Sequence, residues 1–289
     1  MAPDSSGRIL VAGNSDRDPT AGLNDDMVIW RYSSGGTLDT TFNSQGWVVH
    51  DGAAGGAGPD IGVSIALDTS GRILVAGNSD SDPTAGFSDD MVIWRYTFAG
   101  TLDTTFNGQG WVVHDSAAGG AGPDVGVGIA QDASGRIFVA GYSDRDPSTE
   151  ITMDMVIWQY TSGGTLDTAF NGQGWVVHDN AAGGGGFDIG VGIVLDASGR
   201  ILVAGYSDSD PTGVPGYDMA IWRYTSAGTV DATFNGQGWV VHDSAAAGGG
   251  DDFGLALAQD AYGRILVAGY SDSDPTVGTD FDMVIWRFK

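Results

Sequence analysis

Short apolar runs separated by polar, glycine-rich segments recur along the chain. One stretch contains RILVAG (residues 72–77), MVIWRY (91–96), WVVH (111–114) and VGIAQD (127–132). Each run has four to six residues, is rich in Val, Ile, Trp and Tyr, and is bounded by turn-forming residues, which is typical of β-strands. No window of helical length keeps a period of 3.6 residues. The pattern predicts an all-β protein with four short strands in each such stretch.

The four runs belong to a repeat of constant length. The string SGRILVAG, or a near copy, recurs every 64 residues, with its first glycine at Gly7, Gly71, Gly135, Gly199 and Gly263. Both RILVAG and MVIWRY are apolar on both faces, so each sheet must be covered on both sides. Four-stranded sheets that pack on copies of themselves form a β-propeller. A parallel β-helix would have much shorter repeats, and a β-sandwich would not require a constant period.

The strand count predicts five blades of up to four antiparallel strands. RILVAG and MVIWRY have five copies each, whereas the other two runs have four. Residues 1–4 align with only the end of a strand, and no WVVH run follows the last copy, so the first and last blades should be incomplete. Exposed edges of this kind favour oligomerisation. We predict a single domain over residues 1–289, with repeats at about 7–70, 71–134, 135–198 and 199–262 and a partial repeat at 263–289.

The charge excludes several classes of partner. Twelve Lys and Arg residues stand against 37 acidic residues, which gives a net charge of −25. This charge repels phosphate backbones and anionic lipids, so we expect neither nucleic-acid nor membrane-surface binding. No apolar run is long enough to span a bilayer, and no signal-peptide pattern opens the chain. Cysteine is absent, which excludes disulfides and thiolate metal sites.

Aspartates cluster in the segment between the RILVAG and MVIWRY runs, which opens with Asp-x-Asp-Pro in every repeat. Clustered oxygen ligands in a turn suit Ca²⁺, which takes six to eight oxygens. The alternative is that these aspartates cap their own turns, since the spacing does not match an EF-hand loop. The predicted Ca²⁺ ligands are Asp16, Asp18, Asp80, Asp82, Asp144, Asp146, Asp208, Asp210, Asp272 and Asp274.

Two further sets of side chains repeat in the segment GWVVHD. The histidines are His50, His114, His178 and His242, one in each of four repeats, which favours a hydrogen bond at a strand end over a shared metal site. The tryptophans begin a strand near the outer edge, where their rings could stack on sugars, with packing between blades as the alternative. These candidate ligand-binding residues are Trp47, Trp111, Trp175 and Trp239.

The repeat resembles a known family. The segments GRILVAG (71–77) and GTLDTTFN (100–107), together with DDMVIWRY and WVV, are similar to the delta-60 repeat, a bacterial β-propeller family, over essentially the whole chain. The resemblance implies a propeller of the kind found in secreted or surface-attached proteins. Because of this resemblance, we expect an extracellular or cell-surface location. The resemblance supplies no catalytic residues.

Symmetry argues against catalysis. An active site combines different groups around one substrate, whereas near-identical repeats offer the same few groups several times. We expect a non-enzymatic interaction module with equivalent weak sites, Ca²⁺-associated, that binds a glycan or a surface protein with avidity. One alternative is a structural spacer of a larger secreted protein. The other is a hydrolase or lyase with its site in the axial channel, for which Glu150, the only glutamate, is the candidate.

Overall fold

The computed structural model describes residues 1–16, 25–55, 58–81, 88–120, 122–145, 152–209, 216–246, 250–273 and 280–289. Regular structure in these residues is entirely β, which confirms the predicted fold class. No helix among them has the length and apolarity needed to cross a membrane. The strands are β1 (Ala2–Pro3), β2 (Ile9–Asp16), β3 (Asp25–Tyr32), β4 (Trp47–His50), β5 (Asp60–Leu67), β6 (Ile73–Asp80), β7 (Asp89–Tyr96), β8 (Trp111–His114), β9 (Asp124–Gln131), β10 (Ile137–Asp144), β11 (Met153–Tyr160), β12 (Trp175–His178), β13 (Asp188–Leu195), β14 (Ile201–Asp208), β15 (Tyr217–Tyr224), β16 (Trp239–His242), β17 (Asp252–Gln259), β18 (Ile265–Asp272) and β19 (Phe281–Phe288).

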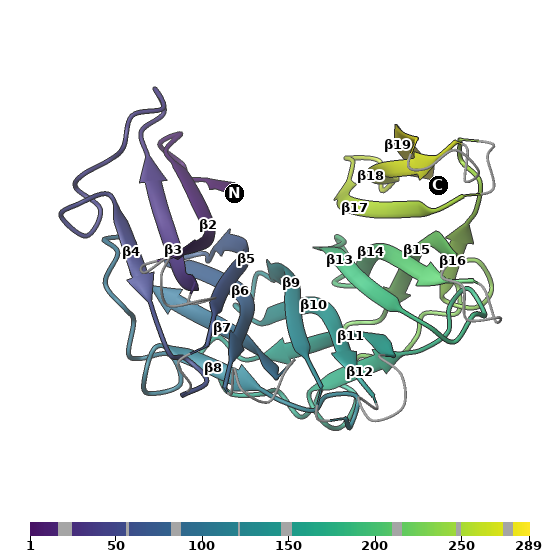
Figure 1. Cartoon of the computed structure of the whole chain (residues 1–289), viewed down its shortest axis with the longest axis horizontal. Coiled ribbons are helices and arrows are strands. Elements are labelled where there is room, and N and C mark those ends of the chain that lie inside the picture. The colour runs from purple at the N-terminus through teal and green to yellow at the C-terminus, as the bar shows by residue number, and fades with distance from the viewer. Residues whose placement is uncertain are drawn as a thin grey trace. The chain divides into compact units, whose positions relative to one another are not determined.

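The strands form five sheets in which neighbours along the chain lie side by side (Figure 1). Four sheets have four strands, β1–β4, β5–β8, β9–β12 and β13–β16, and the fifth has three, β17–β19. The strands of the first, second, fourth and fifth sheets pair antiparallel, as do β11 and β12 in the third. The first sheet begins with a two-residue strand and the last lacks a fourth strand, so the prediction of five blades with incomplete ends is confirmed.

Three strands of the second repeat extend beyond the apolar runs, among them β7, which begins at Asp89 and not at Met91. Strand β6 continues past RILVAG to Asp80, because its last three residues pair with the first three of β7, ending at Asp80 opposite Asp89. Strand β9 begins at Asp124, three residues before the predicted start. Acidic residues assigned to loops from the sequence therefore lie at strand ends.

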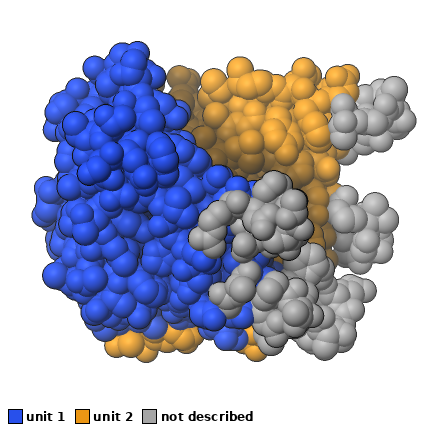
Figure 2. All heavy atoms as spheres, turned by 60° about the vertical axis from the view of Figure 1, so that its left-hand side comes forward, with its two compact units in different colours: residues 1–117, 121–139, 159–166 blue, residues 118–120, 140–158, 167–289 orange. Residues whose placement is uncertain are grey.

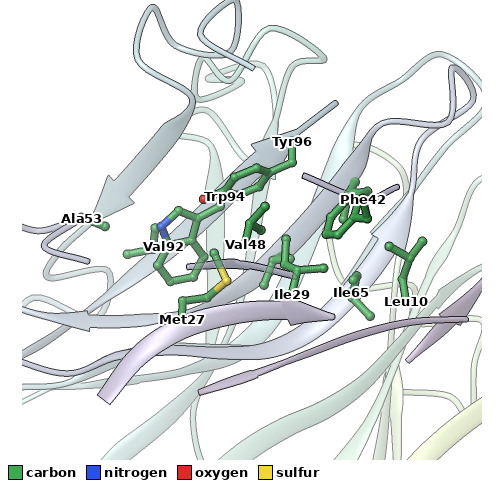
Figure 3. Packing of buried hydrophobic residues seen from close by; sticks show 12 residues of the cluster. Leu10, Met27, Ile29, Phe42, Val48, Ala53, Ile65, Val92, Trp94 and Tyr96 are labelled. Atoms are coloured by element: carbon green, nitrogen blue, oxygen red, sulfur yellow. The ribbon is translucent and has the colours of Figure 1, made fainter. Parts of the chain in front are cut away.

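The chain divides into two compact units (Figure 2). The first comprises residues 1–117, 121–139 and 159–166, and the second comprises 118–120, 140–158 and 167–289, so the third sheet is shared between them. In the first unit, buried side chains from the first two sheets form one apolar cluster that includes Met27, Ile29, Val92 and Trp94 (Figure 3). In the second unit, Met219, Ile221 and Trp286 belong to the corresponding cluster. The prediction of a single domain stays a prediction.

The last sheet differs from the others in how well its faces are covered. Met91 and Ile93 in β7 are 0% exposed, whereas their counterparts in β19, Met283 and Ile285, are 75% and 62% exposed. In the first, second and fourth sheets, the third strand contacts the first strand of the following sheet, as β7 contacts β9. The apolar character of both faces is therefore explained by sheet-on-sheet packing.

Candidate metal centre

Three aspartates recur at equivalent positions in each of four repeats, and we call each set an acidic triad. Each triad combines the second residue of a third strand, the residue after a WVVH strand, and the first residue of the following sheet. In the third and fourth triads, carboxylate oxygens from all three residues lie within 4.8 Å of one another. The triads are Asp26, Asp51 and Asp60 (first); Asp90, Asp115 and Asp124 (second); Asp154, Asp179 and Asp188 (third); and Asp218, Asp243 and Asp252 (fourth).

The last aspartate of each triad is held by the loop that precedes it. In the second triad, the Asp124 carboxylate accepts the backbone N–H groups of Ser116 at 2.6 Å and Ala117 at 3.3 Å. Asp188 accepts the corresponding bonds from Asn180 and Ala181 in the third triad. The loop after each WVVH strand therefore folds around the carboxylate that opens the next sheet. In the third and fourth triads, this places the carboxylate beside the other two acids, one of which lies in the preceding sheet while the other directly follows that sheet's last strand.

Burial and repulsion from neighbouring acids disfavour the ionised form of three triad members on third strands, Asp90, Asp154 and Asp218. Burial, followed by the charges of Asp115 and Asp124, raises the pKa of Asp90 to about 6. In the fourth triad, burial and the charge of Asp243 raise the pKa of Asp218 to about 6, against a hydrogen bond from Ser209 that lowers it. A positive charge between the carboxylates would remove this penalty.

The fourth triad also contains a buried oxygen with spare bonding capacity. Asp252 is 0% exposed, and its Oδ1 has no hydrogen-bond partner among the described residues. Its other oxygen accepts the Ala245 N–H at 3.3 Å. In the equivalent residues Asp124 and Asp188, both carboxylate oxygens accept backbone N–H hydrogen bonds. Three convergent carboxylates with an unused buried oxygen suit a hard divalent cation such as Ca²⁺.

The predicted Ca²⁺ ligands lie elsewhere. The second aspartate of each Asp-x-Asp-Pro motif lies outside the described residues: Asp18, Asp82, Asp146, Asp210 and Asp274. The first aspartate of each motif ends a second strand: Asp16, Asp80, Asp144, Asp208 and Asp272.

Hydrogen bonds place two of these first aspartates at the ends of the acidic segment. Asp80 Oδ1 accepts the Ser88 hydroxyl at 2.7 Å, and Asp208 Oδ1 accepts the Gly216 N–H at 3.2 Å. These bonds are of the turn-capping kind considered as the alternative. Metal binding by these residues stays a prediction, and the structure brings a different set of acids together.

Sequence reasoning missed the triads, although a signal was present. Asp60 and its counterparts recur every 64 residues, each nine residues after the aspartate of GWVVHD. The recurrence was visible, but the position was assigned to a loop. The sequence pattern alone does not show that this carboxylate is buried or that it lies beside acids of the preceding sheet.

Two of the four candidate ligand-binding tryptophans, Trp111 and Trp239, contact the preceding repeat. Trp111 Nε1 donates to the Ala53 carbonyl at 3.0 Å, and its ring meets the His50 ring edge-on at a centroid distance of 4.7 Å. Trp239 makes the same contacts with the Ala181 carbonyl and His178. Trp47 and Trp175 open β4 and β12 and are likewise half-buried. A role of these rings in sugar binding stays a prediction.

Three of the four histidines form the strand-end hydrogen bonds predicted for them: His50, His114 and His178. Nδ1 of His50 lies 3.0 Å from the Tyr96 hydroxyl, and Nδ1 of His178 lies 2.7 Å from the Tyr224 hydroxyl. Burial lowers the pKa of both imidazoles to about 4, so they are neutral at physiological pH. Each pair joins the fourth strand of one sheet to the third strand of the next.

Comparisons with known proteins agree with this architecture. Residues 5–42, 69–106 and 197–234 match the family model described as "Domain of unknown function (DUF5122) beta-propeller", and residues 54–83 match a β-propeller repeat model. No curated protein matches the sequence.

Solved structures show the same fold at low sequence identity. An endo-arabinase from Bacteroides thetaiotaomicron has a TM-score of 0.50 and 9% identity over 100% of this chain and 92% of its own. An α-L-arabinofuranosidase from Fusarium graminearum has a TM-score of 0.50 and 10% identity over 98% of this chain and 72% of its own. The family-model matches and the five sheets support assignment to a repeat β-propeller family.

Proposed function

We propose that this β-propeller repeat protein is a non-enzymatic interaction module that binds Ca²⁺, or a similar hard divalent cation, at its acidic triads. The observation that carries the proposal is the convergence of three carboxylate oxygens within 4.8 Å in the third and fourth triads. A net charge of −25 supports it, because such a field concentrates cations near the surface.

A cation in a triad offers a way to bind a partner. Ca²⁺ takes six to eight oxygen ligands, whereas each aspartate of a triad offers one ligand atom. The remaining positions are available to water or to oxygens of a ligand. A glycan hydroxyl pair or a carboxylate on a surface protein has the right chemistry. Several such sites on one chain would bind a multivalent partner with avidity.

The enzymatic activities named for the similar structures are not part of this proposal. At 9% and 10% identity the likeness relates folds rather than sites. Glu150, the candidate for a catalytic acid, lies outside the described residues. The repeated triads favour binding over catalysis because they offer the same group in each repeat.

Calorimetry tests the cation site directly. CaCl₂ is titrated into EDTA-treated protein, with MgCl₂ in parallel, and thermal unfolding is recorded with and without each cation. We expect saturable Ca²⁺ binding and a higher Tm, since a ligand that binds only the folded state stabilises it. Absence of both effects for both cations would refute the proposal. A glycan array with and without Ca²⁺ then tests the partner.

A matched pair of variants links binding to a triad. Asp218→Asn should remove one site, because Asp218 contributes a ligand oxygen to the fourth triad. Asp282→Asn is the control, since Asp282 occupies the same strand position in β19 but lies exposed in the last sheet, after which no further sheet follows among the described residues. The control should bind as the unaltered protein does.

A further inference from the structure

The triads differ in one neighbouring residue. The position directly after the last residue of each second strand is close to the triad, and we call it the counterion position. It holds Arg145 in the third repeat but Ser81 in the second and Ser209 in the fourth. In the first repeat it is Arg17, which lies outside the described residues. The repeats therefore differ in charge at the counterion position, although each keeps the same three aspartates.

Arg145 places a positive charge beside the third triad. Its Nη1 lies 2.5 Å from Asp179 Oδ2 and 3.7 Å from Asp154 Oδ2. The hydrogen bond to Asp179 and the charges of both acids raise the pKa of the guanidinium. In turn, the charge of Arg145 lowers the pKa of Asp154, which burial and the charge of Asp179 raise to about 7. Hydrogen bonds to Asn180 and Ala181 hold the third acid, Asp188. One guanidinium nitrogen thus lies near two carboxylates of the triad, as a bound cation would.

The serine repeats lack this charge. A hydrogen bond from Ser81 favours the ionised form of Asp90, and one from Ser209 does the same for Asp218, yet a neutral hydroxyl cannot balance three carboxylates. In the fourth triad, the fully buried Asp252 keeps Oδ1 without a hydrogen-bond partner among the described residues. A site with the same acids, no guanidinium and an unused buried oxygen requires a cation from solution.

We propose that Arg145 is a built-in counter-cation: in the third triad the protein's own guanidinium takes the place of a divalent cation, and a divalent cation binds where serine occupies the counterion position, as in the fourth triad, whose three carboxylate oxygens converge. The inference rests on the proposed function, and it names which triad performs it. The third triad is then a cation-independent junction between two sheets, while the fourth responds to the cation concentration.

Exchanging the two residue types tests this inference on the full chain. Ca²⁺ stoichiometry is measured by calorimetry for the unaltered protein, Arg145→Ser, Ser209→Arg and the double variant, with Tb³⁺ luminescence as a second measurement. We expect Arg145→Ser to bind one more Ca²⁺ and Ser209→Arg to bind one fewer, and the double variant to match the unaltered protein. Arg145→Lys, which keeps the charge, should leave the number unchanged.

The outcomes separate the inference from the proposed function. If the unaltered protein binds Ca²⁺ but neither exchange changes the stoichiometry, Arg145 is not a counter-cation and the proposed function stands. If the unaltered protein binds none, the proposed function fails, and the inference fails with it. Should Arg145→Ser not fold, Ser209→Arg decides alone, because unchanged Ca²⁺ binding in that variant would overturn the inference.

Discussion

Met27 packs against Gly62 of the following sheet, with its Cγ 2.9 Å from the position that a Cβ would take on Gly62. The same pair recurs in the later repeats, where the distances are 3.1 Å for Met91 with Gly126 and 3.1 Å for Met219 with Gly254. A side chain at this glycine would enter the space of the methionine. The glycine therefore sets how closely neighbouring sheets approach.

Replacing Gly62 by alanine should destabilise the protein. The added methyl group would also lie 3.1 Å from Val75 Cγ1 and 3.2 Å from the Gly13 carbonyl oxygen, so little room remains for adjustment. Overpacking of this kind costs about 1–3 kcal/mol. Urea or thermal unfolding of Gly62→Ala measures the loss. Gly35→Ala is the control, because a Cβ there would meet only Ser33 Oγ at 3.8 Å, and equal stability of the two variants would contradict the packing role.

The sheets could be predicted from the sequence, because each strand is a local apolar run and the 64-residue interval repeats it. The triads could not. Asp218, Asp243 and Asp252 come from two sheets, and their proximity depends on how a third strand meets the first strand of the next sheet. The sequence analysis placed the Ca²⁺ ligands at the Asp-x-Asp-Pro motifs instead, because acidic residues that are close in the sequence are easy to recognise there. Contacts between repeats carry no such linear signature.

His242 lacks the hydroxyl partner that three other histidines have. Its Nδ1 is buried without a hydrogen-bond partner among the described residues, because Phe288 occupies the position that Tyr224 has one repeat earlier. Phe288→Tyr should add the missing bond and raise the free energy of unfolding by about 1 kcal/mol. Phe281→Tyr, on a more exposed ring of the same strand, should have no effect. A Phe288→Tyr protein no more stable than the unaltered one would refute this account.

The buried histidines should make the fold sensitive to acid. The pKa of His50, His114 and His178 falls from 6.5 to about 4, chiefly through burial. Between these values the unfolded chain binds protons that the folded chain does not, so the histidine contribution to stability falls as pH drops from 6.5 to 4. We expect His178→Phe to lower stability at pH 7.5 but to show a shallower loss on acidification. Denaturant unfolding between pH 4 and 8 gives both slopes, and parallel slopes would exclude the histidine as the cause.

Asp218 should have the opposite pH dependence. Its pKa rises from 3.8 to about 6, so the folded chain retains a proton that the unfolded chain has lost, and stability falls as pH rises from 4 to 6. Asparagine resembles the protonated form. In EDTA at pH 7.5, Asp218→Asn should therefore be more stable than the unaltered protein by roughly 1–2 kcal/mol after allowance for screening, and the difference should vanish near pH 4.

Saturating Ca²⁺ should reverse this order, because only the intact triad gains the free energy of binding. Thermal unfolding of Asp218→Asn and of the Asp282→Asn control, each in EDTA and in Ca²⁺, measures the reversal. A variant that is less stable than the unaltered protein in EDTA at pH 7.5 would show that the three carboxylates do not repel one another. The acidic triad would then be a set of hydrogen-bonded turn residues and not a site that requires a cation.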